Sequence, residues 1–182
     1  MKNSVIGLGK LGLPFALFLA SKNQHVTCCD SNKKIIRDLS NKISPYIEPL
    51  TSKYLKIYSK KITLENNYDN LIKNSQITHL VLPTPSLIDN SFSNEYLLEC
   101  LDKLSKSLLK YKNKSHIINI TSTVMPGSCQ EVFRIFLESK GLKNEKDFII
   151  TYNPHFIAQG TTIKNLENPD FILIGSDSKR GQ

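Results

Sequence analysis

The feature that most constrains this chain is a glycine-rich turn close to the amino terminus, between an apolar strand and an apolar helix. The turn, residues 7–12, reads Gly7-Leu8-Gly9-Lys10-Leu11-Gly12, with a strand expected over 2–6 and a helix over 13–22. In such a turn the first glycine lets the chain leave the strand tightly, the second lets the backbone approach a pyrophosphate, and the third lets the helix pack closely on the sheet. The pattern therefore predicts a βαβ unit that binds a dinucleotide at the helix N-terminus.

An acidic residue follows at the position that such a unit requires. The second expected strand, 25–29, is followed by Asp30, 18 positions after Gly12. A carboxylate there can accept hydrogen bonds from both hydroxyls of an adenine ribose, whereas a 2′-phosphate would meet like charge. We therefore expect NAD as the cofactor rather than NADP, with Lys33 and Lys34 close enough to soften that preference. The alternative is a glycine-rich turn of another α/β fold, with Asp30 as a strand-end cap.

The rest of the chain alternates apolar strands with amphipathic helices. Strands are expected at 61–64, 77–82, 116–120, 147–151 and 171–174, and helices at 32–41, 50–59, 68–73, 94–109 and 126–140. This alternation predicts an α/β protein with a doubly wound (Rossmann), mostly parallel sheet. Because the sequence contains no repeat or low-complexity linker, we expect one domain over residues 1–182.

Composition excludes several classes of function. The formal net charge is +8, but the lysines are scattered singly and are not interleaved with aromatic residues, so we do not expect nucleic-acid binding. No apolar run approaches the roughly 18 residues of a membrane span. The turn begins at residue 7, which leaves no room for a signal peptide, so we expect a cytoplasmic protein. The cysteines form no metal-binding pattern and are expected to be reduced, mostly buried thiols: Cys28, Cys29, Cys100 and Cys129.

Hydroxyl side chains follow two of the expected strands. Thr84 stands after strand 77–82, and Thr123 after strand 116–120. In an open parallel sheet the ligand crevice lies beyond the carboxyl ends of the strands. We therefore expect Thr84 to face the cofactor and Thr123 to lie in the same crevice, with helix capping as the alternative role of Thr123.

Four segments, in their order and spacing, carry a family resemblance. They are residues 7–16, 82–85 (Leu-Pro-Thr-Pro), 122–127 (Ser-Thr-Val-Met-Pro-Gly) and 152–160 (Tyr-Asn-Pro-His-Phe-Ile-Ala-Gln-Gly), the last followed by Asn-Pro-Asp at 168–170. Together they resemble the UDP-glucose/GDP-mannose (nucleotide-sugar) 6-dehydrogenases, including the UDP-N-acetylmannosamine dehydrogenases. The resemblance covers essentially the entire chain, but the family's enzymes are more than twice as long. It implies an amino-terminal NAD-binding domain without the family's central helix and carboxyl-terminal domain.

The resemblance implies oxidation of a sugar C6 alcohol to a carboxylate in two steps with two NAD molecules. It also implies a UDP- or GDP-linked sugar as substrate and a homo-oligomeric parent enzyme. In the family the covalent step uses a cysteine, with a lysine and an asparagine on the central helix and carboxyl-terminal domain. Residues 1–182 alone are therefore expected to be inactive, and neither Cys100 nor Cys129 is a candidate nucleophile.

The resemblance also assigns site residues. The expected cofactor-binding residues are Gly7, Leu8, Gly9, Lys10, Leu11, Gly12, Asp30, Thr84 and Thr123. The expected catalytic residues are Thr123, which matches a threonine thought to position water near the reacting carbon, together with His155 and Gln159. The family has glutamates at the last two positions. A free imidazole titrates near ~6.5 and can take a proton without supplying a fixed negative charge, whereas Gln159 can only hydrogen-bond. The alternative for His155 is a surface-loop histidine.

Two other functions stay open at this point. One is a non-catalytic NAD(H)-binding module that has kept the fold and lost the chemistry. The other is a hydroxy-acid dehydrogenase of the 6-phosphogluconate or 3-hydroxyisobutyrate type, which has a similar first domain. The Leu-Pro-Thr-Pro segment at 82–85 and the Asn-Pro-His-Phe segment at 153–156 count against the second.

Overall fold

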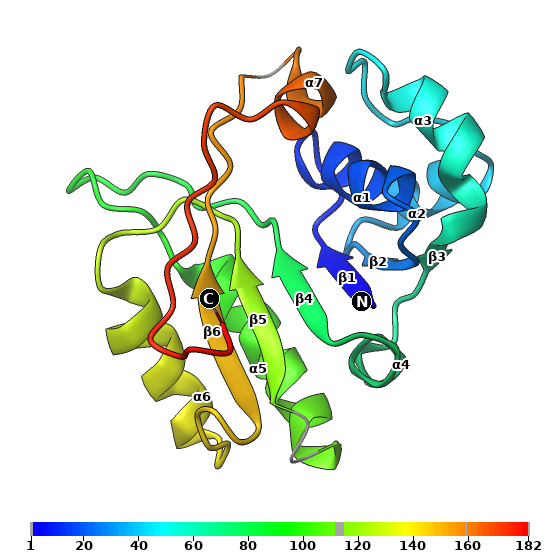
Figure 1. Cartoon of the computed structure of the whole chain (residues 1–182). Helices are drawn as coiled ribbons and strands as arrows, with labels where there is room; N and C mark the ends of the chain where they lie inside the picture. The colour runs from blue at the N-terminus through cyan, green and yellow to red at the C-terminus, as the bar shows by residue number, and fades with distance from the viewer. Residues whose placement is uncertain (1, 112–114, 159, 182) are drawn as a thin grey trace.

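A computed structural model describes residues 2–111, 115–158 and 160–181, and in this part of the chain six parallel strands form one sheet (Figure 1). Their order is β3-β2-β1-β4-β5-β6. The strands are β1 (Asn3–Ile6), β2 (Val26–Cys29), β3 (Ile62–Leu64), β4 (Ile77–Leu80), β5 (His116–Ile120) and β6 (Phe148–Tyr152). The chain runs outward from β1 to β3, returns to β4 beside β1, and then runs outward to β6. This doubly wound order confirms the predicted fold class and places the topological switch point between β1 and β4.

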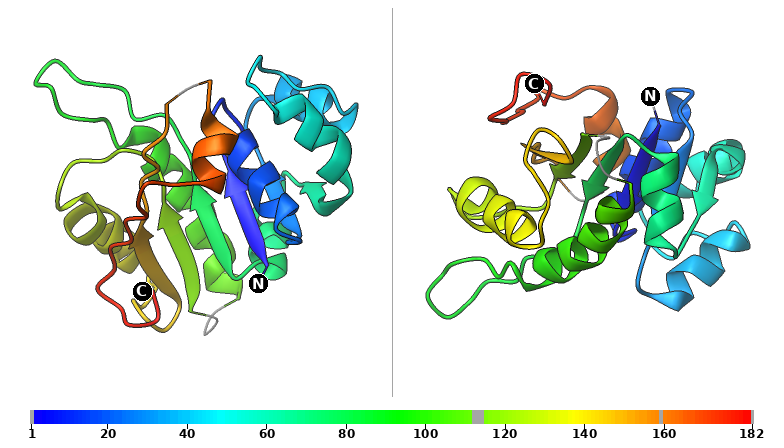
Figure 2. Two further views of the ribbon diagram at one scale, coloured as in Figure 1. Left: turned by 45° about the horizontal axis from the view of Figure 1, so that its top comes forward. Right: turned by 90° about the horizontal axis from the view of Figure 1, so that it is seen from below.

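Helices cover both faces of the sheet (Figure 2). They are α1 (Gly12–Ser21), α2 (Lys33–Ser40), α3 (Thr51–Tyr58), the short η1 (Ser59–Lys61), α4 (Tyr68–Asn74), α5 (Glu95–Lys110), the π-helical η2 (Ser128–Arg134), α6 (Ile135–Ser139) and α7 (Thr162–Glu167). One core joins α1, α2 and α3 to one face, and a second joins α4, α5, η2 and α6 to the other. The chain between α2 and α3, and α7 itself, lie at the end of the sheet where the strands finish.

Cys28 and Cys29 illustrate how a strand divides neighbouring side chains between faces. Cys28 packs in the core with α1, and Cys29 in the core with α5. All four cysteines lie within the described residues and are free thiols, as predicted. Burial raises the pKa of Cys29 to about 11, that of Cys100 to about 12 and that of Cys129 to about 11, so these thiols lack the thiolate character of a nucleophile.

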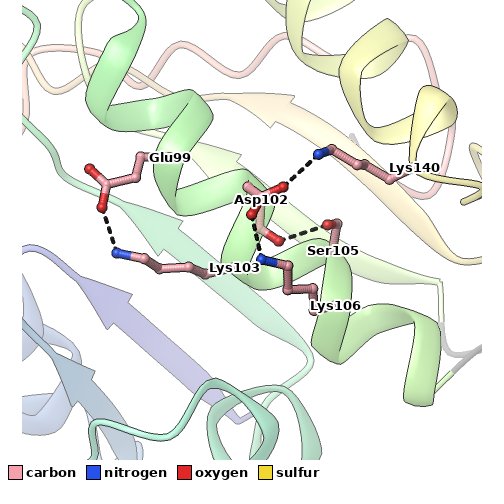
Figure 3. A network of polar contacts seen from close by, with 6 residues as sticks. All are labelled: Glu99, Asp102, Lys103, Ser105, Lys106 and Lys140. Atoms are coloured by element: carbon pink, nitrogen blue, oxygen red, sulfur yellow. Dashed lines mark hydrogen bonds and ion pairs between the residues drawn. The ribbon is translucent and has the colours of Figure 1, made fainter.

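Ion pairs line the outer side of α5, and one of them connects α5 to the end of α6 (Figure 3). Asp102 of α5 accepts hydrogen bonds from Lys106 at 2.7 Å and from Lys140, just beyond α6, at 2.5 Å. One turn earlier, Glu99 pairs with Lys103 at 2.7 Å on another side of α5. Hydrogen bonds from Lys106 and Lys140 lower the pKa of Asp102 to about 2, so its carboxylate is charged across the physiological range.

The predicted strand at 171–174 is wrong. The segment runs beside β6 but pairs with it through an isolated antiparallel bridge, in which Tyr152 and Gly175 exchange two backbone hydrogen bonds of 2.8 Å. The apolar run indicated a buried strand, but its side chains are exposed, with Ile172 at 69%. Apolarity predicts a strand only where a neighbouring element is present to cover it.

The helix predicted at 126–140 begins later than expected. Gly127 has a φ of +83°, a left-handed conformation that interrupts a helix, and the helical turns start at Ser128. Strand β4 likewise ends at Leu80, two residues early, where the chain turns into the Pro83 and Pro85 loop. Within the described residues, every helix is too short or too polar to cross a lipid bilayer.

Candidate functional site

A cleft of about 800 Å³ lies at the carboxyl ends of the central strands, where the strand order reverses. Its volume falls within the range of about 300–1,000 Å³ that is typical of ligand pockets. The structure brings together in its wall most of the site residues expected from sequence, namely Gly7, Gly9, Lys10, Leu11, Gly12, Asp30, Thr84, Thr123 and His155. Gln159 lies outside the described residues, and Leu8 is fully buried beneath the turn, away from the cleft wall.

The glycine turn has the geometry that a pyrophosphate requires. Gly7 has a φ of +93°, and a Cβ atom on Gly12 would lie 1.8 Å from the carbonyl oxygen of Gly7. Gly9 is different, because a Cβ there would meet no described atom within 4 Å and would project into open space. Glycine is therefore needed at 7 and 12 for packing, and at 9 the missing side chain leaves the backbone open to a ligand.

Helix α1 begins at the cleft with Gly12, while the next residue, Leu13, donates its N–H to the Gly9 carbonyl at 3.1 Å and Pro14 has no N–H. Its N-cap residue, Leu11, makes no side-chain capping bond within the described chain, and the first turn carries no acidic residue. The Gly12 N–H and the positive end of the helix dipole therefore remain available to an anion. Lys10, which is exposed at the same place, adds a positive charge.

Asp30 lies directly after β2, against the turn. Its Oδ2 accepts the N–H of Leu8 at 2.6 Å, and its Oδ1 accepts the N–H of Asn32 at 2.8 Å. Each carboxylate oxygen retains a lone pair for a further donor. Lys34 is turned away into an ion pair with Asp38 at 2.7 Å. Neither Lys33 nor Lys34 belongs to the described cleft wall, which leaves Asp30 as the charged residue at this end of β2.

The loops after β4 and β5 carry Thr84 and Thr123 into the cleft. Ser122, which was not among the site residues expected from sequence, joins these two loops. Its hydroxyl donates to the carbonyl of Leu82 at 2.7 Å and accepts the N–H of Leu82 at 2.8 Å. Part of the remaining wall comes from helices α4 and α5, where no motif marked the residues concerned: Tyr68, Tyr96, Glu99, Cys100 and Lys103.

His155 approaches the cleft from the loop after β6. Its ring lies edge-on to that of Phe15 in α1, with 4.5 Å between ring centroids. Its Nδ1 is buried and has no hydrogen-bond partner among the described residues, while the residue itself lines the cleft. Burial lowers the pKa of His155 to about 4, which makes the imidazole neutral at physiological pH. His155 is therefore a half-buried side chain of the loop after β6, and its catalytic role stays a prediction.

Comparison with known proteins decides the family. The model of the "UDP-glucose/GDP-mannose dehydrogenase family, NAD binding domain" matches residues 1–182. The chain belongs to this family. Its region is the NAD-binding domain, so the cofactor of the family is NAD, and the open turn, free helix N-terminus and Asp30 carboxylate fit such a dinucleotide.

Curated family members show the same relationship along the whole chain. UDP-glucose 6-dehydrogenase of Rickettsia prowazekii (strain Madrid E) is 30% identical over 184 residues, which cover 100% of this chain and 40% of that enzyme. GDP-mannose 6-dehydrogenase of Pseudomonas syringae pv. tomato is 28% identical over 182 residues, covering 98% of this chain and 41% of that enzyme. The chain therefore spans about 40% of the length of the curated relatives that it matches.

Solved structures agree on the fold. A ternary complex of GDP-mannose dehydrogenase from Pseudomonas aeruginosa superimposes with a TM-score of 0.93 at 24% identity, covering 100% of this chain and 42% of that one. For a 3-hydroxyisobutyrate dehydrogenase from Mycobacterium tuberculosis the TM-score is 0.58 at 13% identity, with 99% of this chain and 47% of that one covered. Because the family model and the curated relatives match along the whole chain, the hydroxy-acid alternative is not favoured.

Proposed function

We propose that this chain is the single NAD-binding domain of a nucleotide-sugar 6-dehydrogenase, and that the family's central helix and carboxyl-terminal domain lie outside residues 1–182. The observation that supports the proposal is the cleft itself, which collects the glycine turn, Asp30 and the two strand-end threonines around the switch point. The family match along the whole chain supports it independently.

The first part of the proposal concerns how the chain binds the NAD cofactor. The N–H groups at the start of α1 donate to the diphosphate, and Lys10 neutralises part of its charge. Asp30 accepts the adenine ribose hydroxyls, and Thr84 forms part of the opposite wall. NAD bound in this way would supply the hydride acceptor for oxidation of an alcohol.

The substrate half of the proposal concerns Thr123, His155 and Gln159. The exposed Thr123 hydroxyl can hold a water or a sugar hydroxyl near the reacting carbon. A neutral His155 with a free Nδ1 can accept a hydrogen bond or a proton, but its low pKa makes it a weak base at pH 7. Gln159, as an amide side chain, can orient a substrate hydroxyl by hydrogen bonding but cannot take a proton. These residues therefore position the substrate without replacing the family's carboxylates.

The expected partners follow from the same assignment. We propose a UDP- or GDP-linked sugar as substrate, which matches the chemistry named for the relatives from Rickettsia and Pseudomonas. We also propose a homo-oligomeric parent enzyme in the cytoplasm, without nucleic-acid or membrane partners. The free thiols of the described residues suit a reducing compartment.

Titration with NADH, followed by cofactor fluorescence, tests the cofactor half. We expect saturable binding, and a failure to saturate at millimolar NADH would overturn the proposal. Incubation with NAD and UDP-glucose, UDP-N-acetylmannosamine or GDP-mannose tests whether residues 1–182 can oxidise a nucleotide sugar by themselves. We expect no NADH to form. NADH binding without sugar oxidation, even after addition of a family carboxyl-terminal domain, would instead favour the non-catalytic NAD(H) module.

A further inference from the structure

Glu48 is a buried carboxylate in the loop between α2 and α3, with 8% of its surface exposed. It accepts the N–H of Gly160 at 3.0 Å on Oε1 and 3.1 Å on Oε2, and the N–H of Thr162 at 3.1 Å on Oε1. A charged group is buried only where hydrogen bonds or opposite charge replace its hydration. Glu48 therefore forms a specific attachment between two parts of the chain that are more than 100 residues apart.

The ionisation of Glu48 agrees with this attachment. Burial alone raises the pKa of the carboxyl group, but hydrogen bonds from Thr162 and Gly160, together with the nearby Lys10 ammonium, outweigh burial and lower the pKa below its usual value. The carboxylate is thus charged at neutral pH. A charged acceptor makes stronger hydrogen bonds than a neutral one.

The segment that Glu48 holds forms one wall of the NAD cleft. Residues 155–158 and 160–162, which we call the strap, connect the carboxyl end of β6 to α7. The strap contributes His155, Ile157 and Thr162 to the cleft wall. In Figures 1 and 2 the strap and α7 pass from the β6 side of the sheet to the end of α1. The strap therefore follows β6, in the second half of the sheet, but lies beside α1, in the first half.

Other contacts fasten the same region to the amino-terminal half. The helix α7 packs against α1, and the Tyr54 hydroxyl of α3 donates to Glu167 at the end of α7. The Phe15 ring contacts that of His155. However, α7 has six residues, too few to be stable alone. Glu48 bonds to the strap at Gly160 and at Thr162, the first residue of α7.

We propose that Glu48 is a positioning residue that fixes the strap across the cleft and thereby places His155 and determines NAD affinity. Glu48 does not line the described cleft and touches neither cofactor nor substrate; it acts through the strap. This inference rests on the proposed function, because the strap matters for binding only if the dinucleotide occupies the cleft. Its local structural part, the fixing of the strap, can be measured without any cofactor.

The experiment compares Glu48→Gln with Glu65→Gln in the full 182-residue chain. Glutamine keeps the size of Glu48 but provides one acceptor oxygen in place of two charged ones. Glu65 is the control, since its carboxylate also accepts a main-chain N–H, from Asn67 at 2.8 Å, but it holds the loop before α4 and not the strap. The readouts are NMR amide exchange at Gly160 and Thr162, the His155 ring shifts, the melting temperature and the NADH dissociation constant.

For Glu48→Gln we expect about tenfold faster exchange at Gly160 and Thr162, as lost hydrogen bonds to a charged acceptor should give. We also expect shifted His155 ring signals and about tenfold weaker NADH binding. Glu65→Gln should change none of these. Unchanged amide exchange or unchanged His155 shifts in Glu48→Gln would overturn the inference. It would also be overturned if both variants lost NADH affinity to the extent that their melting temperatures fell, since the loss would then reflect general destabilisation. If the wild-type chain fails to bind NADH, the proposed function fails, and the exchange and shift data still decide whether Glu48 positions the strap.

Discussion

The carboxylate of Asp30 accepts the main-chain N–H of Leu8 at 2.6 Å, so the acid at the end of β2 is attached to the glycine turn itself. The same side chain also accepts the N–H of Asn32 at 2.8 Å. The residue expected to bind the adenine ribose is therefore oriented by the loop expected to bind the diphosphate. Asp30 and the turn should respond together to mutation.

Asp30→Ala should weaken NADH binding roughly 10- to 100-fold, because it removes hydrogen bonds to a charged acceptor worth about 1.5–3 kcal/mol. It should weaken NADPH binding much less, since loss of the negative charge removes repulsion of the 2′-phosphate. Fluorescence titrations with both cofactors measure the difference. Asp89→Ala, in the exposed loop before α5, is the control and should alter neither affinity. Equal losses for the two cofactors in Asp30→Ala would mean that the carboxylate does not reach the ribose.

Gly9→Ala and Gly12→Ala should separate ligand binding from folding. A methyl group on Gly9 meets no described atom, so Gly9→Ala should melt within a few degrees of the wild-type chain but lose most NADH affinity by obstructing the diphosphate. A Cβ on Gly12 would overlap the Gly7 carbonyl, so Gly12→Ala should lose about 1–3 kcal/mol or more of stability as well. Thermal melts and NADH titrations of both variants measure this. Wild-type affinity in a folded Gly9→Ala variant would contradict the placement of the diphosphate.

The pH dependence of stability should reveal the neutral state of His79. Asn119 donates to its Nδ1 at 2.9 Å, and its Nε2 lies 3.2 Å from Asn3 Oδ1, an arrangement that fits the neutral ring. Burial, assisted by nearby His155, lowers the pKa of His79 to about 3. In the unfolded chain the pKa is near ~6.5, so between these values the unfolded state holds the extra proton. Stability should therefore fall as the pH drops below about 6.5, with a slope from His79 of up to ~1.4 kcal/mol per pH unit.

Urea unfolding between pH 4 and 7, in the wild-type chain and in His79→Gln, measures this contribution. Glutamine has no proton to gain, so the wild-type free energy of unfolding should fall more steeply toward pH 4 than that of the variant. The difference between the two curves isolates His79 from other titrating groups. Parallel curves would show that the folded and unfolded states protonate His79 at the same pH.

The apolar strip at residues 171–174 should cause self-association at high concentration. Four consecutive large apolar side chains are at least 45% exposed there, and the Phe171 ring contacts that of the exposed Phe156 at a tilt. Contiguous exposed apolar surface favours association. Ile172→Lys should therefore lower the apparent mass in light scattering without changing the melting temperature. Ile57→Lys, at an exposed isoleucine on α3, is the matched control, and an equal effect there would indicate general charge repulsion.

Much of the fold could be predicted because its signals are local. Gly7 has a positive φ, Gly12 leaves room for the Gly7 carbonyl, and Gly9 leaves its backbone open, so their spacing marks the turn, and the alternation of strands and helices indicates a parallel sheet. The strand at 171–174 could not be predicted correctly, because exposure depends on which elements cover a segment and not on its own apolarity.

The sequence by itself determined the glycine turn, the acid after β2 and the hydroxyls at two strand ends, since each depends on residue type and spacing within a short segment. The tertiary structure alone decided that Glu48 holds the strap, that Ser122 joins two loops, and that Phe15 lies against His155. These contacts join residues far apart in the chain. Their geometry arises only when the sheet forms, because packing brings together side chains that no local pattern relates.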